Sequence, residues 1–168
     1  MSVRGLIWKE GDRWFGALVS DEGVVWLDWS ASRDALKRKV APYIGVQAGA
    51  AVRRNLERLR REMHEYLAGK RKRFTVPVVP QGTDFERRVW AALRSIPYGK
   101  SMSYGDLAAQ IGKPRAARAV GQAAGKNPIP IIIPCHRLLA SHGKIGGFTG
   151  GLEEKKKLLI HEGIVWVE

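Results

Sequence analysis

The sequence changes character at Pro80-Gln81-Gly82. Before this point, short runs of β-branched and aromatic residues alternate with turn residues, a pattern typical of antiparallel strands. After it, apolar residues recur every three or four positions, and hydroxyl-bearing residues stand where helices would begin. A proline beside a glycine favours a linker over either regular element. We therefore predict two domains, residues 1–80 and 81–168, each with its own small core.

The first domain is predicted to be α/β. Its strands are expected in an antiparallel meander at residues 3–9, 14–20 and 23–29. A short helix is expected from Ser32 to about residue 40, because serine is a preferred N-cap. A continuous apolar stripe predicts a longer helix over residues 50–68. Residues 74–79 are expected to add a last strand.

The second domain is predicted to be mainly helical. Thr83-Asp84-Phe85-Glu86 matches a capping box, in which a hydroxyl and a carboxylate satisfy the first backbone N–H groups of a helix. Ser103-Tyr104-Gly105-Asp106 has the same form and opens a second helix. A third helix is expected over residues 115–125. Two short helices joined by a tight turn are typical of a helix-turn-helix.

The predicted third helix consists mainly of residues with small side chains. Alanine and glycine occupy nearly every face, and Arg118 projects from it. Small residues let a helix approach another surface closely, and two surfaces fit this description. One is the core of the domain, and the other is a DNA groove, into which Arg118 would reach.

The only cysteine, Cys135, follows three isoleucines and a proline and precedes His136. The isoleucine run and the proline predict an extended segment that ends abruptly. A thiol reacts as its thiolate, so a cysteine beside a base is a candidate nucleophile. A lone cysteine is also commonly a small buried hydrophobe. One cysteine excludes an internal disulfide and a multi-cysteine zinc site, and we expect no metal.

The formal net charge is +13, and both halves contribute, with +7 on residues 1–81 and +6 on residues 82–168. Such a charge is typical of a protein that binds a polyanion, although a basic surface can also serve solubility. The run Lys70-Arg71-Lys72-Arg73 is either a solvated face or a phosphate contact. No apolar run is long enough for a membrane span, and the N-terminus has no signal-peptide pattern. A thiol that must stay reduced fits the cytoplasm.

Pro134-Cys135-His136-Arg137 resembles the alkyl-acceptor motif of the O6-alkylguanine-DNA alkyltransferases, the methylated-DNA–protein-cysteine methyltransferases. The order of motifs from Thr83 to Gly163 is similar to that family's DNA-binding and active-site domain. The resemblance implies a ribonuclease-H-like α/β domain with a supporting role, followed by a mainly α, winged helix-turn-helix-like domain.

The resemblance also implies roles for single residues. Cys135 would accept the alkyl group, and His136, held by Glu162, would act through a water molecule as the general base. Tyr104 would assist the leaving guanine, and Asn127 would join the helix end to the acceptor segment. Arg118 would fill the gap left by a flipped-out nucleotide. Candidate phosphate contacts are Ser103, Tyr104, Arg115 and Lys113, and the base pocket would comprise Leu138, Gly147, Phe148, Thr149 and Gly150. Threonine at position 149 replaces the family's usual serine but keeps the hydroxyl.

The expected function is direct-reversal repair of double-stranded DNA. An alkyl group would move from O6 of guanine, or O4 of thymine, to Cys135 in one irreversible turnover after base flipping. We expect no cofactor, since the glycine-dense residues 145–151 lack a nucleotide-binding fingerprint, and a monomer that can bind DNA cooperatively. Three alternatives remain open. The first is a non-enzymatic binder of alkylated bases, which would lack the cysteine, and the second is a helix-turn-helix transcription factor, which would need base-reading side chains. The third is a cysteine hydrolase, which would turn over repeatedly.

Overall fold

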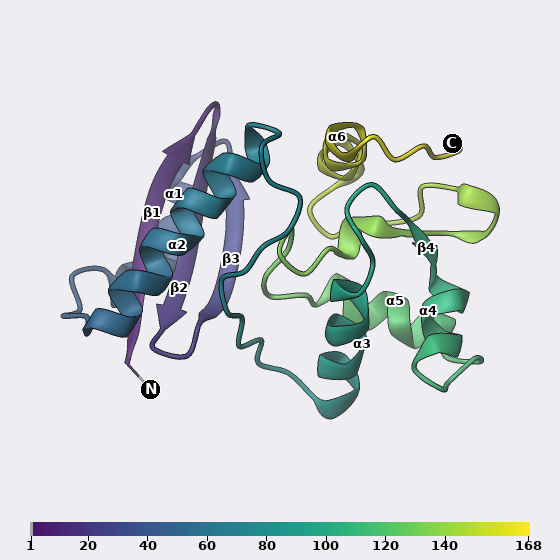
Figure 1. Cartoon of the computed structure of the whole chain (residues 1–168), viewed down its shortest axis with the longest axis horizontal. Coiled ribbons are helices and arrows are strands. Elements are labelled where there is room, and N and C mark those ends of the chain that lie inside the picture. The colour runs from purple at the N-terminus through teal and green to yellow at the C-terminus, as the bar shows by residue number, and fades with distance from the viewer. Residues whose placement is uncertain (1) are drawn as a thin grey trace. The chain divides into compact units, whose positions relative to one another are not determined.

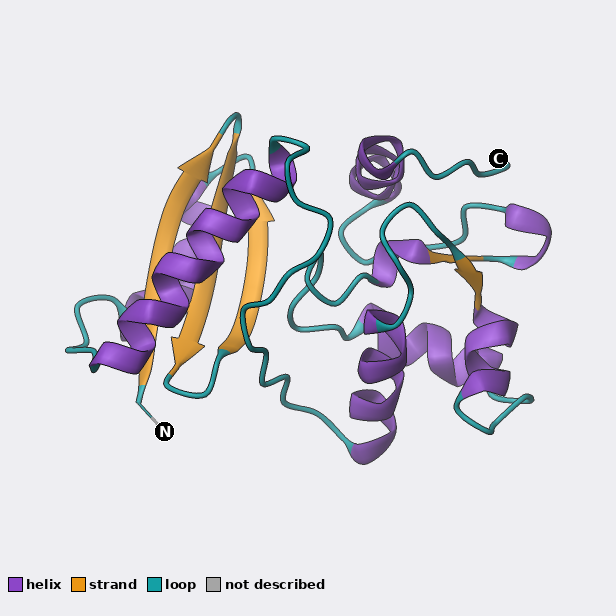
Figure 2. Ribbon diagram, viewed as in Figure 1, coloured by secondary structure: helices purple, strands orange, loops and turns teal. Residues whose placement is uncertain are grey.

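The chain divides between Gln81 and Gly82 into two units in the computed structural model, which describes residues 2–168. The first unit contains a three-stranded sheet with strand order β1-β2-β3, and the second contains most of the helices (Figures 1 and 2). The mixed α/β character expected of the chain is therefore confirmed.

The sheet of the first unit is the antiparallel meander that the sequence predicts. Its strands are β1 (Val3–Glu10), β2 (Arg13–Ser20) and β3 (Val24–Ser30). β1 pairs with β2 along its whole length, from Val3 opposite Ser20 to Glu10 opposite Arg13. The turn between them places Gly11 at φ 58°, a left-handed conformation that glycine adopts without a steric penalty.

Two helices cover the sheet, α1 (Arg33–Val40) and α2 (Ala50–Leu67), with a short 3₁₀ turn η1 (Ala41–Tyr43) after α1 (Figure 1). α1 packs closely against β1 and β2 because Gly5 and Gly16 carry no side chain there. A Cβ atom on Gly5 would lie 2.7 Å from Cγ1 of Val40. α2 buries Val52, Leu59 and Met63, which belong to the predicted apolar stripe. Both helix predictions are confirmed to within a residue.

The strand predicted for residues 74–79 does not form, and that prediction is wrong. Only one isolated parallel bridge, between Val24 and Val78, joins this segment to the sheet. Pro77 removes a backbone donor from the segment, and Pro80 follows directly after it. The buried carboxylate of Glu62 accepts hydrogen bonds from the backbone N–H groups of Thr75 and Val76, at 2.8 and 3.0 Å. These N–H groups therefore do not bond to a neighbouring strand.

The second unit is mainly helical (Figure 2). Its elements are α3 (Asp84–Arg94), β4 (Met102–Ser103), α4 (Tyr104–Gln110), α5 (Ala117–Gly125), the 3₁₀ turn η2 (Cys135–Arg137), β5 (Leu138–Leu139), the 3₁₀ turn η3 (Ser141–Gly143) and α6 (Leu152–Glu162). β4 and β5 pair in parallel. Among residues 2–168, no helix is long and apolar enough to cross a membrane.

Local signals place the helix ends of this unit. Thr83 and Glu86 form the reciprocal capping box at the start of α3. Ser103 accepts a hydrogen bond from the backbone N–H of Asp106 at the start of α4. α5 begins two residues later than expected. Gly163, at φ 70°, ends α6. Within the core, the indole N–H of Trp90 on α3 donates to the carbonyl of Ala123 on α5, at 2.8 Å, which holds these two helices together.

The segment before Cys135 is not the regular extended segment that its three isoleucines predict. Ile131 has φ 72°, a conformation that is strained for a β-branched residue, and the only bridge is between Pro130 and Ile133. Ile129, Ile131 and Ile133 are nevertheless buried. The isoleucines therefore anchor a compact loop, and side-chain hydrogen bonds described below hold its backbone.

Candidate active site

Cys135 is the first residue of the 3₁₀ turn η2 and is almost completely buried, with 9% of its surface exposed. Its backbone N–H donates to the carbonyl of Ile133 at 2.8 Å. Burial raises the pKa of the thiol above its usual value, and a hydrogen bond from Asn127 and the positive charge of Lys155 oppose that rise. The thiol therefore needs both a proton acceptor and a compensating charge before it can act as a nucleophile.

Asn127 fixes the loop that carries Cys135. Its side-chain amide donates to the carbonyl of Ile133 at 2.7 Å, and its side-chain oxygen accepts from the backbone N–H of Ile129 at 2.9 Å. One side chain that follows the end of α5 thus holds both ends of the strained turn around Ile131. The asparagine that sequence resemblance places between helix and acceptor segment lies at that junction.

His136, Arg137 and Glu162 form a buried cluster between η2 and the last turn of α6. Nε2 of His136 lies 2.7 Å from Oε1 of Glu162, and the guanidinium of Arg137 donates to both carboxylate oxygens, at 2.8 and 3.0 Å. Arg137 also donates to the carbonyl of Ile96 at 2.6 Å. Burial alone would raise the pKa of Glu162, but the hydrogen bonds from His136 and Arg137 outweigh it and hold the pKa well below its usual range. Glu162 is therefore ionised.

The protonation state of His136 follows from the same contacts. Burial lowers its pKa, since the hydrogen bond to Glu162 only partly offsets desolvation, and the imidazole is neutral at pH 7. A neutral ring that donates from Nε2 to a carboxylate carries its lone pair on Nδ1. Nδ1 is buried and has no hydrogen-bond partner among residues 2–168. The cluster therefore presents a buried proton acceptor in the residue that follows the cysteine.

Lys155 is the charged residue that the sequence analysis missed. Its side chain is completely buried, and Nζ donates to the carbonyls of Leu138 and Gly147, at 2.7 and 3.2 Å. Desolvation lowers its pKa to about 8, which the interaction with Cys135 partly opposes. A signal for it was present: Lys155 and Glu162 stand seven residues apart, at positions of α6 that face the core together with Leu158 and Leu159.

Tyr104 and the glycine-rich residues 145–151 lie close together. The hydroxyl of Tyr104 is 3.5 Å from the carbonyl of Gly147, the same carbonyl that Lys155 contacts. A Cβ atom on Gly146 would lie 3.3 Å from that hydroxyl, and one on Gly121 would lie 3.5 Å from the ring. Burial raises the pKa of Tyr104, which keeps the hydroxyl protonated and able to donate. The glycines allow this close approach.

The remaining predicted pocket residues divide between core and surface. Leu138 is fully buried, whereas Gly147, Thr149 and Gly150 are exposed. The hydroxyl of Thr149 donates to the carbonyl of Gly125 at 2.9 Å, which ties the loop to the end of α5. The ring of Phe148 lies 3.0 Å from where a Cβ atom of Gly150 would be, so Phe148 packs on its own loop.

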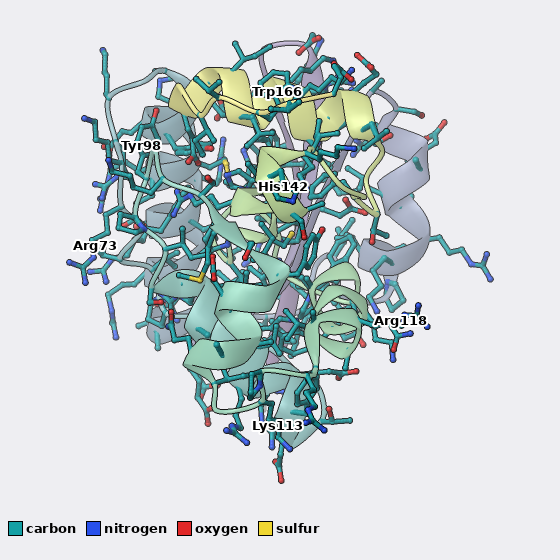
Figure 3. The ribbon with its side chains drawn as sticks, turned by 90° about the vertical axis from the view of Figure 1, so that its right-hand side faces the viewer. Arg73, Tyr98, Lys113, Arg118, His142 and Trp166 are labelled. Atoms are coloured by element: carbon teal, nitrogen blue, oxygen red, sulfur yellow. The ribbon has the colours of Figure 1, made fainter. Side chains whose placement is uncertain are left out.

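The predicted DNA contacts lie on or near α4 and α5. Lys113 and Arg115 are exposed in the connection between these helices, and Arg118 is exposed on α5. Figure 3 shows Lys113 and Arg118 projecting outward from separate places on this unit. Ser103 is only partly exposed, and its hydroxyl accepts the N-cap hydrogen bond of α4, which leaves its proton available for donation.

Comparisons with known proteins show the family to which this chain belongs. A family model described as the DNA-binding domain of 6-O-methylguanine DNA methyltransferase matches residues 84–164. The constitutive methylated-DNA–protein-cysteine methyltransferase of Bacillus subtilis is 38% identical over 156 residues, which cover 93% of this chain and 86% of the relative. The crystal structure of Mycobacterium tuberculosis O6-methylguanine methyltransferase matches with a TM-score of 0.76 at 34% identity, covering 95% of this chain and 92% of the other. A second M. tuberculosis structure, in complex with DNA, matches with a TM-score of 0.75 at 36% identity, covering 95% of this chain and 91% of the other. The chain belongs to the methylated-DNA–protein-cysteine methyltransferase family.

Proposed function

We propose that this protein repairs double-stranded DNA by moving an alkyl group from O6 of guanine, and from O4 of thymine, to Sγ of Cys135. The single observation that carries the proposal is the placement of the chain's only cysteine next to a buried histidine whose Nε2 is hydrogen-bonded to the ionised Glu162, which makes Nδ1 the proton acceptor. Family membership and the DNA complex of a relative support the choice of substrate.

The reaction is a displacement at carbon. The thiol of Cys135 gives its proton through a water molecule to Nδ1 of His136, and Sγ then attacks the alkyl carbon. The bond from that carbon to O6 breaks, its electron pair stays on O6, and a proton donated by Tyr104 neutralises the departing guanine. Glu162 orients His136 and stabilises the imidazolium, as the carboxylate does in a hydrolase triad.

Arg137 changes the charge balance of this relay. Its guanidinium already neutralises Glu162, so a protonated His136 would leave the buried cluster with a net positive charge next to the thiolate. That charge and the ammonium of Lys155 both favour the anion over the buried thiol. His136 acts as the proton acceptor, and Lys155 contributes positive charge through a side chain that also holds the glycine-rich loop to Leu138.

The target base must leave the helix stack to reach a cysteine that is 9% exposed. We assign Arg118 to the space that the flipped nucleotide vacates, since a planar guanidinium can stack on bases and donate hydrogen bonds to the orphaned partner. Ser103, Tyr104, Lys113 and Arg115 contact phosphates, and the carbonyls of Cys135 and Leu138 accept from the guanine amine. Gly147, Phe148, Thr149 and Gly150 form one wall of the base pocket.

The finer assignment of the fold belongs to the same proposal. Residues 1–80 form a ribonuclease-H-like domain that supports the second domain, and residues 81–168 form a winged helix-turn-helix-like domain that carries DNA binding and alkyl transfer. The protein acts as a monomer and can bind along DNA cooperatively. We assign it to the cytoplasm, because a nucleophilic thiol stays reduced there.

The product is a thioether, which water does not readily cleave, so each molecule reacts once. Intact-protein mass after incubation with a duplex containing O6-methylguanine tests this. We expect a gain of one methylene, located on Cys135, that stops at one equivalent. Cys135→Ser serves as the control and should gain nothing while still binding the duplex. Tight binding by the unmodified protein without any mass gain would instead indicate a lesion-sensing protein.

A further inference from the structure

The positive charge of the first unit is concentrated in one segment. Residues 53–73 contain nine Arg or Lys and three Glu, a net charge of +6, whereas the whole of residues 1–81 carries +7. One of the three glutamates, Glu62, is completely buried and accepts backbone hydrogen bonds, so it offers little to solvent. The remaining 60 residues of the unit are therefore nearly neutral. The positive electrostatic potential of the first unit arises from α2 and the residues that follow it.

The cations of α2 lie on its solvent side. Val52, Leu56, Leu59 and Met63 face the sheet. Arg54, Arg58 and Arg61 lie on the opposite side of the helix, and Arg53 and Arg60 lie at the edges of the apolar stripe. All five helical cations are arginines, and all are exposed, namely Arg53, Arg54, Arg58, Arg60 and Arg61. Arg54, Arg58 and Arg61 are spaced four and three residues apart, so they lie along one line on the helix. Arg73 projects outward beyond the helix end (Figure 3).

The surface is poorly neutralised by its own acids. Glu65 is 2.6 Å from Arg71 and 3.9 Å from Arg61, so its charge is shared between two cations, and the buried Glu62 lies 3.8 Å from Arg71. Glu57 is the other carboxylate on this face. Arg54, Arg58 and Arg60 have no ion-pair partner among residues 2–168. The segment therefore presents several guanidinium groups to solvent together.

This arrangement works against the stability of the helix. Like charges four residues apart, as at Arg54 and Arg58, destabilise an isolated helix by about 0.2–0.5 kcal/mol per pair. The first turn of α2 contains no acidic residue, and Arg53 and Arg54 lie near the end where the helix dipole disfavours cations. A helix face that served only solubility would alternate Glu with Lys, and its charge pairs and the helix dipole would then stabilise the helix. Guanidinium groups also match phosphate geometry, with two parallel donors each.

We infer that the exposed face of α2, together with residues 70–73, is a second DNA-binding surface that contacts backbone phosphates without reading sequence. The inference rests on the proposed function, because it takes duplex DNA as the partner. It adds to that proposal a binding role for the first unit beyond support. About 12 Å separates Arg53 from Arg61 along the axis of α2, a span over which duplex DNA presents several charges, at one per ~1.7 Å.

The test measures affinity for an undamaged duplex as a function of salt. The triple variant Arg54→Gln, Arg58→Gln, Arg61→Gln removes three charges and keeps a good helix former at each position. Each lost phosphate contact should reduce the slope of log Kobs against log[salt] by about 0.9, so a loss of about 1 to 3 in slope is expected. Melting temperature and far-UV circular dichroism should show that the variant is as well folded as the wild type.

The matched control removes the same net charge from the same unit. Lys37→Gln, Arg38→Gln, Lys39→Gln acts on three exposed cations of α1. A local binding surface predicts a loss of slope for the α2 variant and little change for the α1 variant. Equal changes in both variants would mean that only net charge matters and would overturn the inference, as would an unchanged slope in the α2 variant.

A second measurement separates this inference from the proposed function. Transfer to Cys135 from O6-benzylguanine, used as a free base, needs no phosphate contact and should proceed at the same rate in the wild type and in the α2 variant. If the wild type transfers no alkyl group from any substrate, the proposed function fails, yet the salt slope on undamaged duplex still decides whether α2 binds DNA.

Discussion

Nε2 of His136 lies 2.7 Å from Oε1 of Glu162, and both side chains are completely buried. The two residues are 26 positions apart in the sequence, one in the turn that follows Cys135 and the other in the last turn of α6. Because Arg137 also binds this carboxylate, Glu162 positions His136 and Arg137, the two residues that follow the cysteine. Removing its charge should therefore affect stability and reactivity together.

Glu162→Gln should destabilise the protein strongly. The amide cannot neutralise Arg137, and breaking a buried ion pair by removing one partner typically costs about 3–5 kcal/mol. The pKa of Glu162 is lower in the folded state than in the unfolded state, so its contribution is complete above about pH 4.5 and is lost as the pH falls through the folded-state pKa. Urea unfolding at pH 7 and at pH 4 measures both effects. Glu153→Gln, at an exposed position in the first turn of the same helix, is the control and should cost no more than about 1 kcal/mol.

Lys155→Met should change the pH dependence of both stability and thiol reactivity. In the wild type, the folded-state pKa of about 8 lies below the unfolded value near 10.5, so the buried charge opposes folding at neutral pH. That opposition is relieved as the pH rises from 8 towards 10.5, and stability gains from this residue over that range. The variant should lack this gain in thermal unfolding.

The same variant should also raise the pKa of Cys135, because the thiol loses a nearby positive charge. Iodoacetamide modification followed against pH reports this, with the midpoint moving upward in Lys155→Met. Lys157→Met, which removes an exposed charge from the same helix, controls for net charge. A midpoint that moves equally in both variants would contradict a local role for Lys155.

Asn127→Ala should loosen the loop that carries Cys135. The substitution removes the donor to the carbonyl of Ile133 and the acceptor for the N–H of Ile129. Leaving buried polar groups unpaired costs about 1–3 kcal/mol each, so a loss of about 2–6 kcal/mol is expected from urea unfolding. Alkyl transfer should slow as well, because Asn127 also bonds the thiol. Gln122→Ala, at an exposed position of α5, should do neither.

Alkylation of Cys135 should itself lower stability. The thiol is enclosed by buried neighbours, and forcing an extra carbon group into a close-packed site costs about 1–3 kcal/mol. The added alkyl group should also disturb the hydrogen bonds of Asn127, which hold the strained turn at Ile131. The melting temperatures of the unreacted, methylated and benzylated proteins should fall in that order. Equal values for all three would show that the pocket accommodates the product without strain.

The sequence by itself determined the elements that depend on local chemistry. The strands of the meander follow from alternating β-branched and aromatic residues, and α2 follows from its apolar stripe. Thr83 and Glu86 place the start of α3, and Gly163 places the end of α6, because each satisfies backbone groups within a few residues. Family resemblance supplied the candidate site residues, which composition and periodicity could not have ranked.

Only the tertiary structure decided where distant side chains replace regular backbone pairing. Glu62 accepts hydrogen bonds from N–H groups of residues 74–79 that would otherwise pair with a strand. Asn127 holds the isoleucine segment in a strained loop. At both places the β propensity of the residues therefore predicted the wrong structure. Lys155 belongs to a run of charged residues, and such a run usually lies on a solvated surface. In the fold its side chain is buried and donates hydrogen bonds to the carbonyls of Leu138 and Gly147. Burial sets its charge state, as it does those of Cys135 and His136, and burial depends on packing between elements far apart in the chain.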